Sequence, residues 1–120
     1  EHADEFNTPF ARLADFTAQR DRVRAACEAI GRDPDSMIFS AALVVACGID
    51  DAEVQRRAAN IDKDAADLIE HAAGGTVQQL VDTLGRWSEA GADRIYLQLL
   101  DLDDLDHVRL IGGEVLPHLA

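Results

Sequence analysis

Residues 75–102, GTVQQLVDTLGRWSEAGADRIYLQLLDL, decide the fold class of this chain. Thr76 and Gln79 have the spacing of a capping box, which predicts that a helix begins at this point. Apolar residues recur at helical spacing from Val77 to Trp87, and Gly91 then ends the helix. Residues 93–100 are mostly apolar and predict a strand. Since a further helix follows, this stretch is one step of a parallel sheet that is covered by helices.

The same alternation of strands and helices runs through the rest of the chain. The predicted order is β-α-β-α-α-β-α, which indicates an α/β fold with parallel strands and flanking helices. Residues 37–47 are apolar on both faces, as is typical of a parallel strand buried on both sides. The predicted elements cover residues 3–7 (strand), 15–30 (helix, with Asp15 as its N-cap), 37–47 (strand), 50–60 (helix), 61–75 (short helix and loop), 76–90 (helix), 93–100 (strand) and 105–116 (helix).

The composition limits the possible partners. The chain has 120 residues, of which 48% are apolar and 28% are charged, a globular balance. Its formal net charge of −12 repels a phosphate backbone, so we expect no nucleic-acid partner. The longest apolar run, at residues 37–47, is too short to cross a membrane. The acidic N-terminus lacks the apolar segment of a signal peptide, and we expect no membrane partner.

The cysteines and histidines predict neither a disulfide nor a metal site. Cys27 and Cys47 lie in unlike contexts, and we expect both to be buried, reduced thiols of a cytoplasmic protein. The four histidines are dispersed along the chain without metal-ligand spacing, so we expect no zinc. Gly74 and Gly75 precede a predicted helix, where backbone amides either hold a phosphate or belong to a flexible loop before the threonine cap.

Candidate site residues follow from strand position. In parallel α/β barrels, reactive side chains lie at the carboxyl ends of strands, and this rule selects residues 5–7, Cys47 and Gly48, and Gln98, Leu100 and Asp101. Of these, the candidates for a cofactor or substrate pocket are Glu5, Phe6, Asn7, Gln98 and Asp101. Asn7 either orients a ligand or caps the turn before Pro9, and Phe6 packs either on a flat ring or in the core. Gln98 either faces the ligand or lies on the surface. Asp101 has the place of an N-cap or first-turn acid of the last helix. No residue is identified as catalytic.

Four segments resemble, in order, segments of the bacterial luciferase-like flavin and deazaflavin oxidoreductases. Residues 3–7, ADEFN, are similar to the Ala-Asp-Gly-Trp-Asn strand of that family, with Glu5 and Phe6 in place of glycine and tryptophan. The other three segments are CEAIGRDP at residues 27–34, GTVQQLV at 75–81 and EAGADRIYL at 89–97. In the third, Val77 stands where the family usually has proline.

The resemblance implies a (β/α)8 barrel that transfers hydride between a deazaflavin, coenzyme F-420, and a small organic substrate. Residues 1–120 would then be the C-terminal three βα units of a single barrel domain, without its five N-terminal units. Such a fragment is expected to be inactive alone and to need the missing part of the barrel or a second copy as partner, as a homo-oligomer. One alternative is an FMN-dependent luciferase-like monooxygenase. The other is a non-catalytic, self-associating α/β module.

Overall fold

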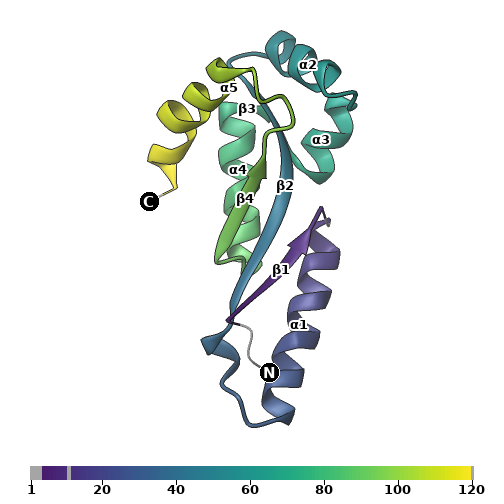
Figure 1. The fold of residues 1–120 in the computed structure, drawn as a ribbon, viewed down its shortest axis with the longest axis vertical. Coiled ribbons are helices and arrows are strands. Elements are labelled where there is room, and N and C mark those ends of the chain that lie inside the picture. The colour runs from purple at the N-terminus through teal and green to yellow at the C-terminus, as the bar shows by residue number, and fades with distance from the viewer. Residues whose placement is uncertain (1–3, 11, 120) are drawn as a thin grey trace.

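A computed structural model describes residues 4–10 and 12–119 of the chain (Figure 1). Ala3, the first residue of the predicted first strand, lies outside the described residues. The strands are β1 (Glu5–Pro9), β2 (Ile38–Gly48), β3 (Ala73–Thr76) and β4 (Arg94–Gln98). The α-helices are α1 (Leu13–Ala29), α2 (Asp51–Asn60), α3 (Ala65–His71), α4 (Val77–Glu89) and α5 (Leu105–Leu110). A 3-10 turn precedes β2 (Pro34–Ser36), and α5 continues as a π turn (Ile111–Val115) and a 3-10 turn (Leu116–His118).

The long strand β2 is the centre of a parallel sheet (Figure 1). β1 pairs with residues 38–42 of β2, and β4 pairs with residues 40–44. Because these two stretches overlap, β1 and β4 lie on opposite edges of β2. β3 pairs further along, with residues 45–48. The carboxyl end of β2 therefore extends beyond the ends of both β1 and β4.

The sheet contains a fourth strand, β3, where the sequence predicted part of a loop. Its four residues, AGGT, include two glycines, which are depleted in strands. Gly74 fits because a Cβ atom there would lie only 2.7 Å from the backbone of Leu68 in α3. The strand forms where a helix packs closely on the sheet, which is a tertiary effect that local propensity does not report.

The N-caps of two helices differ from the prediction. α1 begins at Leu13, so Asp15 lies in its first turn and Arg12 is the N-cap residue. α5 is capped by Asp104, whose carboxylate accepts a hydrogen bond from the backbone N–H of His107 at 3.1 Å. The predicted capping box of α4 is confirmed: Thr76 and Gln79 exchange hydrogen bonds of 2.8 and 3.4 Å.

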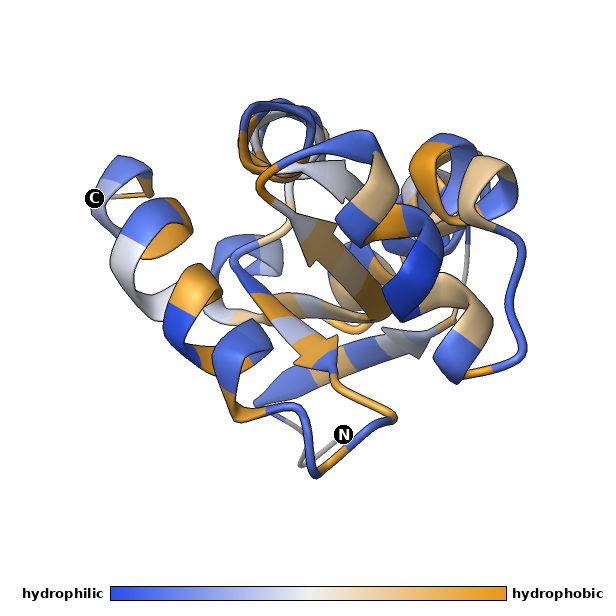
Figure 2. Cartoon of the chain, turned by 90° about the horizontal axis from the view of Figure 1, so that it is seen from above, coloured by the Kyte–Doolittle hydropathy of each residue, from blue (hydrophilic) through white to orange (hydrophobic). Residues whose placement is uncertain are grey.

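The core lies on both faces of β2, as the apolar pattern predicted. Alternate residues such as Phe39 and Leu43 pack with α1 and α4, where the rings of Phe16 and Trp87 lie 5.1 Å apart. On the other face, Val44 and the adjoining carboxyl-terminal half of β2 pack against α2 and α3. In Figure 2, the view from above, hydrophobic and hydrophilic positions alternate along the helices that surround the strands. In α4 the apolar side faces the core, since Leu80, Leu84 and Trp87 are buried there.

The sheet is open rather than closed. Over the described residues, β1 and β4 each pair only with β2, so each has one edge without a partner strand. The radius of gyration is 15.6 Å, against about 14 Å for a compact domain of this length. Among the described helices, none is long and apolar enough to cross a membrane.

Candidate functional site

The strand register gathers polar side chains on the face of the sheet that α1 and α4 leave bare. Paired residues of parallel strands point to the same face, and the side chains of Phe39 and Leu43 are in the core with α1 and α4. Their neighbours in β2 therefore point the opposite way. The residues that share this second face are Glu5, Asn7 and Pro9 of β1, Ile38, Ser40, Ala42 and Val44 of β2, and Arg94, Tyr96 and Gln98 of β4. We call this set the polar sheet face.

Hydrogen bonds link the polar sheet face across three strands. The Asn7 amide donates to the Ser40 hydroxyl at 2.9 Å. The hydroxyl of Tyr96 donates to Glu5 at 3.0 Å, and Arg94 forms an ion pair with Glu5 at the same distance. Hydrogen bonding by Ser40 and then Tyr96 holds the pKa of Glu5 below its ordinary value, and Arg94 adds to this effect. Glu5 is therefore a carboxylate at neutral pH.

Three of the five predicted site residues, Glu5, Asn7 and Gln98, lie on the polar sheet face. Phe6 does not: it pairs with Phe39 and packs against the apolar core, so only the core alternative fits it. Asp101 lies in the loop after β4, where its carboxylate accepts a hydrogen bond from the N–H of Asp103 at 3.1 Å. The expectation that Asp101 is the N-cap of the last helix is wrong, because Asp104 has that role.

An open cleft lies beside the carboxyl ends of β1 and β4. Its volume is about 440 Å³, within the range of small-molecule sites. Its lining comes from β2, from α3 and the turn before it, and from the segments that follow β1 and β4: Phe10, Arg12, Leu43, Val44, Lys63, Asp67, Leu68, His71, Ala72 and Leu100. Gln98 pairs with Val44, so the polar sheet face reaches this cleft at its carboxyl end.

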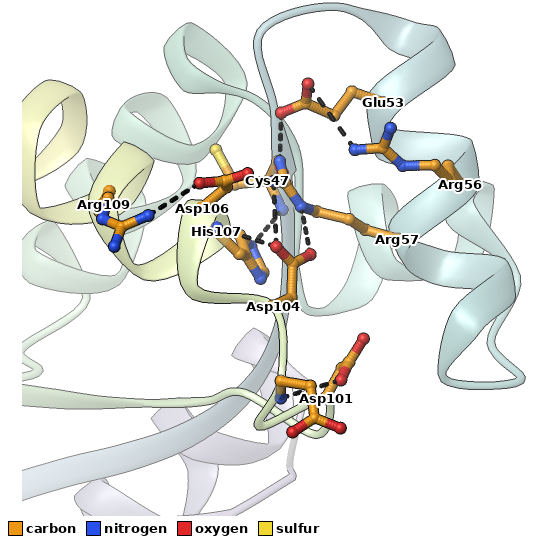
Figure 3. Close-up of polar contacts among 10 residues, drawn as sticks. Cys47, Glu53, Arg56, Arg57, Asp101, Asp104, Asp106, His107 and Arg109 are labelled. Atoms are coloured by element: carbon orange, nitrogen blue, oxygen red, sulfur yellow. Dashed lines mark hydrogen bonds and ion pairs between the residues drawn. The ribbon is translucent and has the colours of Figure 1, made fainter.

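A second polar cluster surrounds the buried guanidinium of Arg57 at the end of β2 (Figure 3). Arg57 donates to the Asp104 carboxylate at 2.8 and 3.4 Å and to the carbonyl of Cys47 at 2.8 Å. It also pairs with Glu53, one helical turn earlier. The backbone N–H of Cys47 donates to Nε2 of His107 at 2.9 Å. We call these five residues the Arg57 cluster.

The electrostatics of the Arg57 cluster fix its protonation states. Burial alone lowers the pKa of Arg57, but hydrogen bonding and charge from Asp104, and then from Glu53, raise it above its ordinary value. The hydrogen bond from Arg57 is the main cause of a lowered pKa for Asp104. Burial, and next the charge of Arg57, lower the pKa of His107. The cluster therefore holds a charged arginine, a carboxylate and a neutral imidazole.

The Arg57 cluster is built for structure rather than for acid-base or nucleophilic chemistry. Burial raises the pKa of the Cys47 thiol to about 11, so the reactive thiolate is scarce at neutral pH. The Nε2 lone pair of His107 is already used by a backbone N–H, so it does not act as a base. Three sequence signals point to parts of the cluster: the strand-end position of Cys47, the i, i+4 spacing of Glu53 and Arg57, and the capping spacing of Asp104 and His107.

Phosphate binding at the start of α4 does not fit the structure. The capping box uses the N–H groups of Thr76 and Gln79, and a Cβ at Gly75 would meet the Gln79 side chain at 2.6 Å. The glycines therefore accommodate the protein's own atoms. Across residues 4–10 and 12–119, no group of three or more histidine, cysteine or acidic residues is arranged to hold a metal ion.

Comparison with solved structures relates the fold to redox enzymes. The chain is similar to a coenzyme F-420-dependent tetrahydromethanopterin reductase from Methanopyrus kandleri, with a TM-score of 0.74 and 16% identity over 100% of this chain and 46% of that one. It is also similar to an F-420-dependent secondary alcohol dehydrogenase, with a TM-score of 0.76 and 15% identity over 98% of this chain and 43% of the other. The chain is also similar to an EDTA monooxygenase from Chelativorans sp. BNC1, with a TM-score of 0.71 and 16% identity over 97% of this chain and 41% of that one.

These likenesses establish the fold. The α/β class with parallel strands and flanking helices, as found in luciferase-like barrel proteins, is confirmed. The chain spans less than half the length of each of these three structures. No protein-family model matches the sequence, and the search of curated proteins finds no match.

Proposed function

We propose that residues 1–120 form the C-terminal three βα units of a barrel oxidoreductase that transfers hydride between coenzyme F-420 and a small organic substrate. One observation carries this proposal: the polar sheet face runs into an open cleft at the carboxyl ends of β1 and β4. Carboxyl ends of parallel strands are where barrel enzymes bind their ligands. Two structures with this fold are those of F-420-dependent enzymes, which supports the choice of cofactor.

The donors and acceptors of the polar sheet face fit one wall of a site for a flavin-type ring. Such a ring is flat and apolar, with amide-like groups at one edge, and it supplies the hydride chemistry when bound. Gln98 makes no side-chain hydrogen bond to the described residues, so its amide is free to pair with a ring edge. Asn7 uses its N–H on Ser40, which leaves its oxygen as an acceptor. The phosphate of the cofactor would be held by other parts of a barrel.

Two alternatives are retained. An FMN-dependent monooxygenase is supported by the monooxygenase that shares the fold, and its ring has the same shape and hydrogen-bonding edge. A non-catalytic module that self-associates is supported by the free edges of β1 and β4, because an unpaired strand edge is a template for another chain. If the chain belongs to either kind of barrel enzyme, its partner is the remaining part of the barrel or a second copy.

The buried free thiols of Cys27 and Cys47 fit a reducing compartment such as the cytoplasm.

Spectroscopic titration separates these possibilities. A barrel that contains this chain is mixed with F-420 or with FMN, and binding is followed by the absorbance and fluorescence of each ring. We expect tighter binding of F-420 and turnover with its reduced form. If only reduced FMN supports turnover, the cofactor is FMN and the F-420 part of the proposal is wrong. If neither ring binds and the 120-residue chain forms stable oligomers alone, the non-catalytic module is correct.

Amide variants test the contribution of the sheet face. Gln98→Leu is expected to weaken ring binding by about tenfold, the value of one hydrogen bond to a buried polar group. Gln78→Leu is the matched control, since Gln78 lies on α4 and its amide bonds to Asp82. Equal ring binding by both variants would show that Gln98 does not contact the ring.

The 120-residue chain alone is expected to show no turnover. Any turnover by it would contradict the proposal that the chain is an inactive part of a barrel.

A further inference from the structure

The cleft beside β1 and β4 contains two cations that have no partner among the described residues. Arg12 is the N-cap residue of α1, and Lys63 lies in the turn between α2 and α3. Neither side chain forms an ion pair or hydrogen bond with a described residue. Most arginines of this chain do form ion pairs: Arg20, Arg24, Arg56, Arg57, Arg94 and Arg109. In a chain with net charge −12, which offers many carboxylates, unpaired cations at one cleft need an explanation.

Part of the cleft lining is apolar. Leu43, Val44 and Leu68 contribute to the lining, and the last two belong to the smaller core of the sheet. Phe10 and Leu100 line the cleft, and they are 64% and 48% exposed to solvent. Large apolar side chains exposed beside a concave surface are typical of ligand grooves.

The charges around the cleft select a ligand with a single negative charge. The lining of the cleft contains one carboxylate, Asp67, and the two cations. His71 also lines the cleft, and its Nε2 lies 3.7 Å from the carboxylate of Glu70. A polyphosphate or nucleic acid needs more cations than this, and the acidic chain repels it. An apolar wall beside an excess of positive charge instead matches a molecule with an apolar body and one anionic head.

We propose that this cleft binds an amphipathic monocarboxylate, with its apolar chain against Val44, Leu68 and Leu100 and its carboxylate at Arg12 and Lys63. The head would supply the missing partner for both cations, and charge-assisted hydrogen bonds to a carboxylate are among the stronger polar contacts. The apolar chain would cover side chains that are now in water. The proposed function invokes the same cleft as the carboxyl end of its site, but binding of the monocarboxylate does not depend on a redox cofactor.

Lys63 provides a direct readout, since it is the only lysine in the sequence. Acetylation by an amine-reactive ester therefore modifies one side chain, and mass spectrometry of the peptide that contains Lys63 measures its rate separately from that of the N-terminal amine. Octanoate is the test ligand, acetate has the charge without the chain, and 1-octanol has the chain without the charge. We expect octanoate to slow acetylation of Lys63, and we expect no protection by acetate at the same concentration. Absence of protection by octanoate, or equal protection by acetate, would overturn the proposal.

Calorimetry on variants supplies the second measurement. Arg12→Gln and Lys63→Gln are each expected to lower the affinity for octanoate by about fivefold, as for a partly exposed ion pair, and to leave binding of 1-octanol unchanged. Arg22→Gln is the control, because Arg22 is an exposed arginine of α1 outside the cleft. Wild-type affinity in both cleft variants, with circular dichroism showing that they are folded, would refute the site. If octanoate binds while neither F-420 nor FMN does, this inference holds and the proposed redox function fails.

Discussion

Arg57 and Asp104 lie 47 residues apart in the sequence and face each other at 2.8 Å. Through this pair, α2 is attached to the N-terminus of α5. A third hydrogen bond from Arg57, to the carbonyl of Cys47, attaches both helices to the end of β2. The Arg57 cluster thus fixes the segments that follow β2 and β4, next to the candidate cleft.

Replacing Arg57 should unfold the chain more easily. Arg57→Met leaves the carboxylates of Asp104 and Glu53 close together and the Cys47 carbonyl without its donor. Loss of one partner from a buried pair costs about 3 kcal/mol in the free energy of unfolding, which urea denaturation measures. Arg56→Met is the control: its side chain is 62% exposed and 3.9 Å from Glu53, so we expect a change below about 0.5 kcal/mol. Equal effects of the two variants would contradict a structural role for the cluster.

Stability should fall as the pH is lowered through the titration range of histidine, because of His107. Burial and the charge of Arg57 lower its pKa from 6.5, so below that pH the unfolded chain binds a proton that the folded chain does not. The free energy of unfolding therefore rises with pH in this window and falls as pH drops below about 6.5. His107→Gln keeps an acceptor for the Cys47 N–H and removes the titration. The urea midpoint should therefore vary less with pH in the variant than in the wild type. An equal pH dependence in both would show that a group other than His107 causes it.

The sequence predicts local features of this fold better than features made by packing. The step from α4 to β4 is predictable because the capping pair Thr76 and Gln79 lies three residues apart. β3 is not, because its glycines are required by the approach of α3, which no local pattern records. The Arg57 cluster joins residues 47–57 to residues 104–107. Local spacing indicates some of its members, but their meeting is visible only in the structure.

The candidate site shows what strand alternation adds. Adjacent residues of a strand point to opposite faces, so Phe6 and Asn7 are not able to share one site wall. That rule alone separates Phe6 from Glu5 and Asn7, and the core contacts of Phe6 agree with it. No such rule predicts the cations of the cleft. Arg12 and Lys63 lie outside the strands, and the tertiary fold places both at the cleft.

Both cysteines should resist modification in the folded chain. Cys27 and Cys47 are buried, free thiols, and the pKa of Cys47 is raised to about 11 by burial. A colorimetric disulfide reagent near neutral pH should therefore label neither cysteine rapidly, and both should react in denaturant. The reaction of the folded chain reports local opening. Rapid stoichiometric labelling of Cys47 under native conditions would contradict its buried position.

Two glycine-to-alanine substitutions should have opposite effects. At Gly74 a Cβ atom would lie 2.7 Å from the backbone carbonyl carbon and the Cβ of Leu68, so α3 must move away from the sheet. Overpacking of this kind costs about 1–3 kcal/mol. At Gly85, in α4, nothing lies within 4 Å of the added atom, and alanine should stabilise the helix by about 0.5–1 kcal/mol. Urea unfolding of both variants measures this difference. A stable Gly74→Ala variant would mean that α3 does not pack on β3 at this distance.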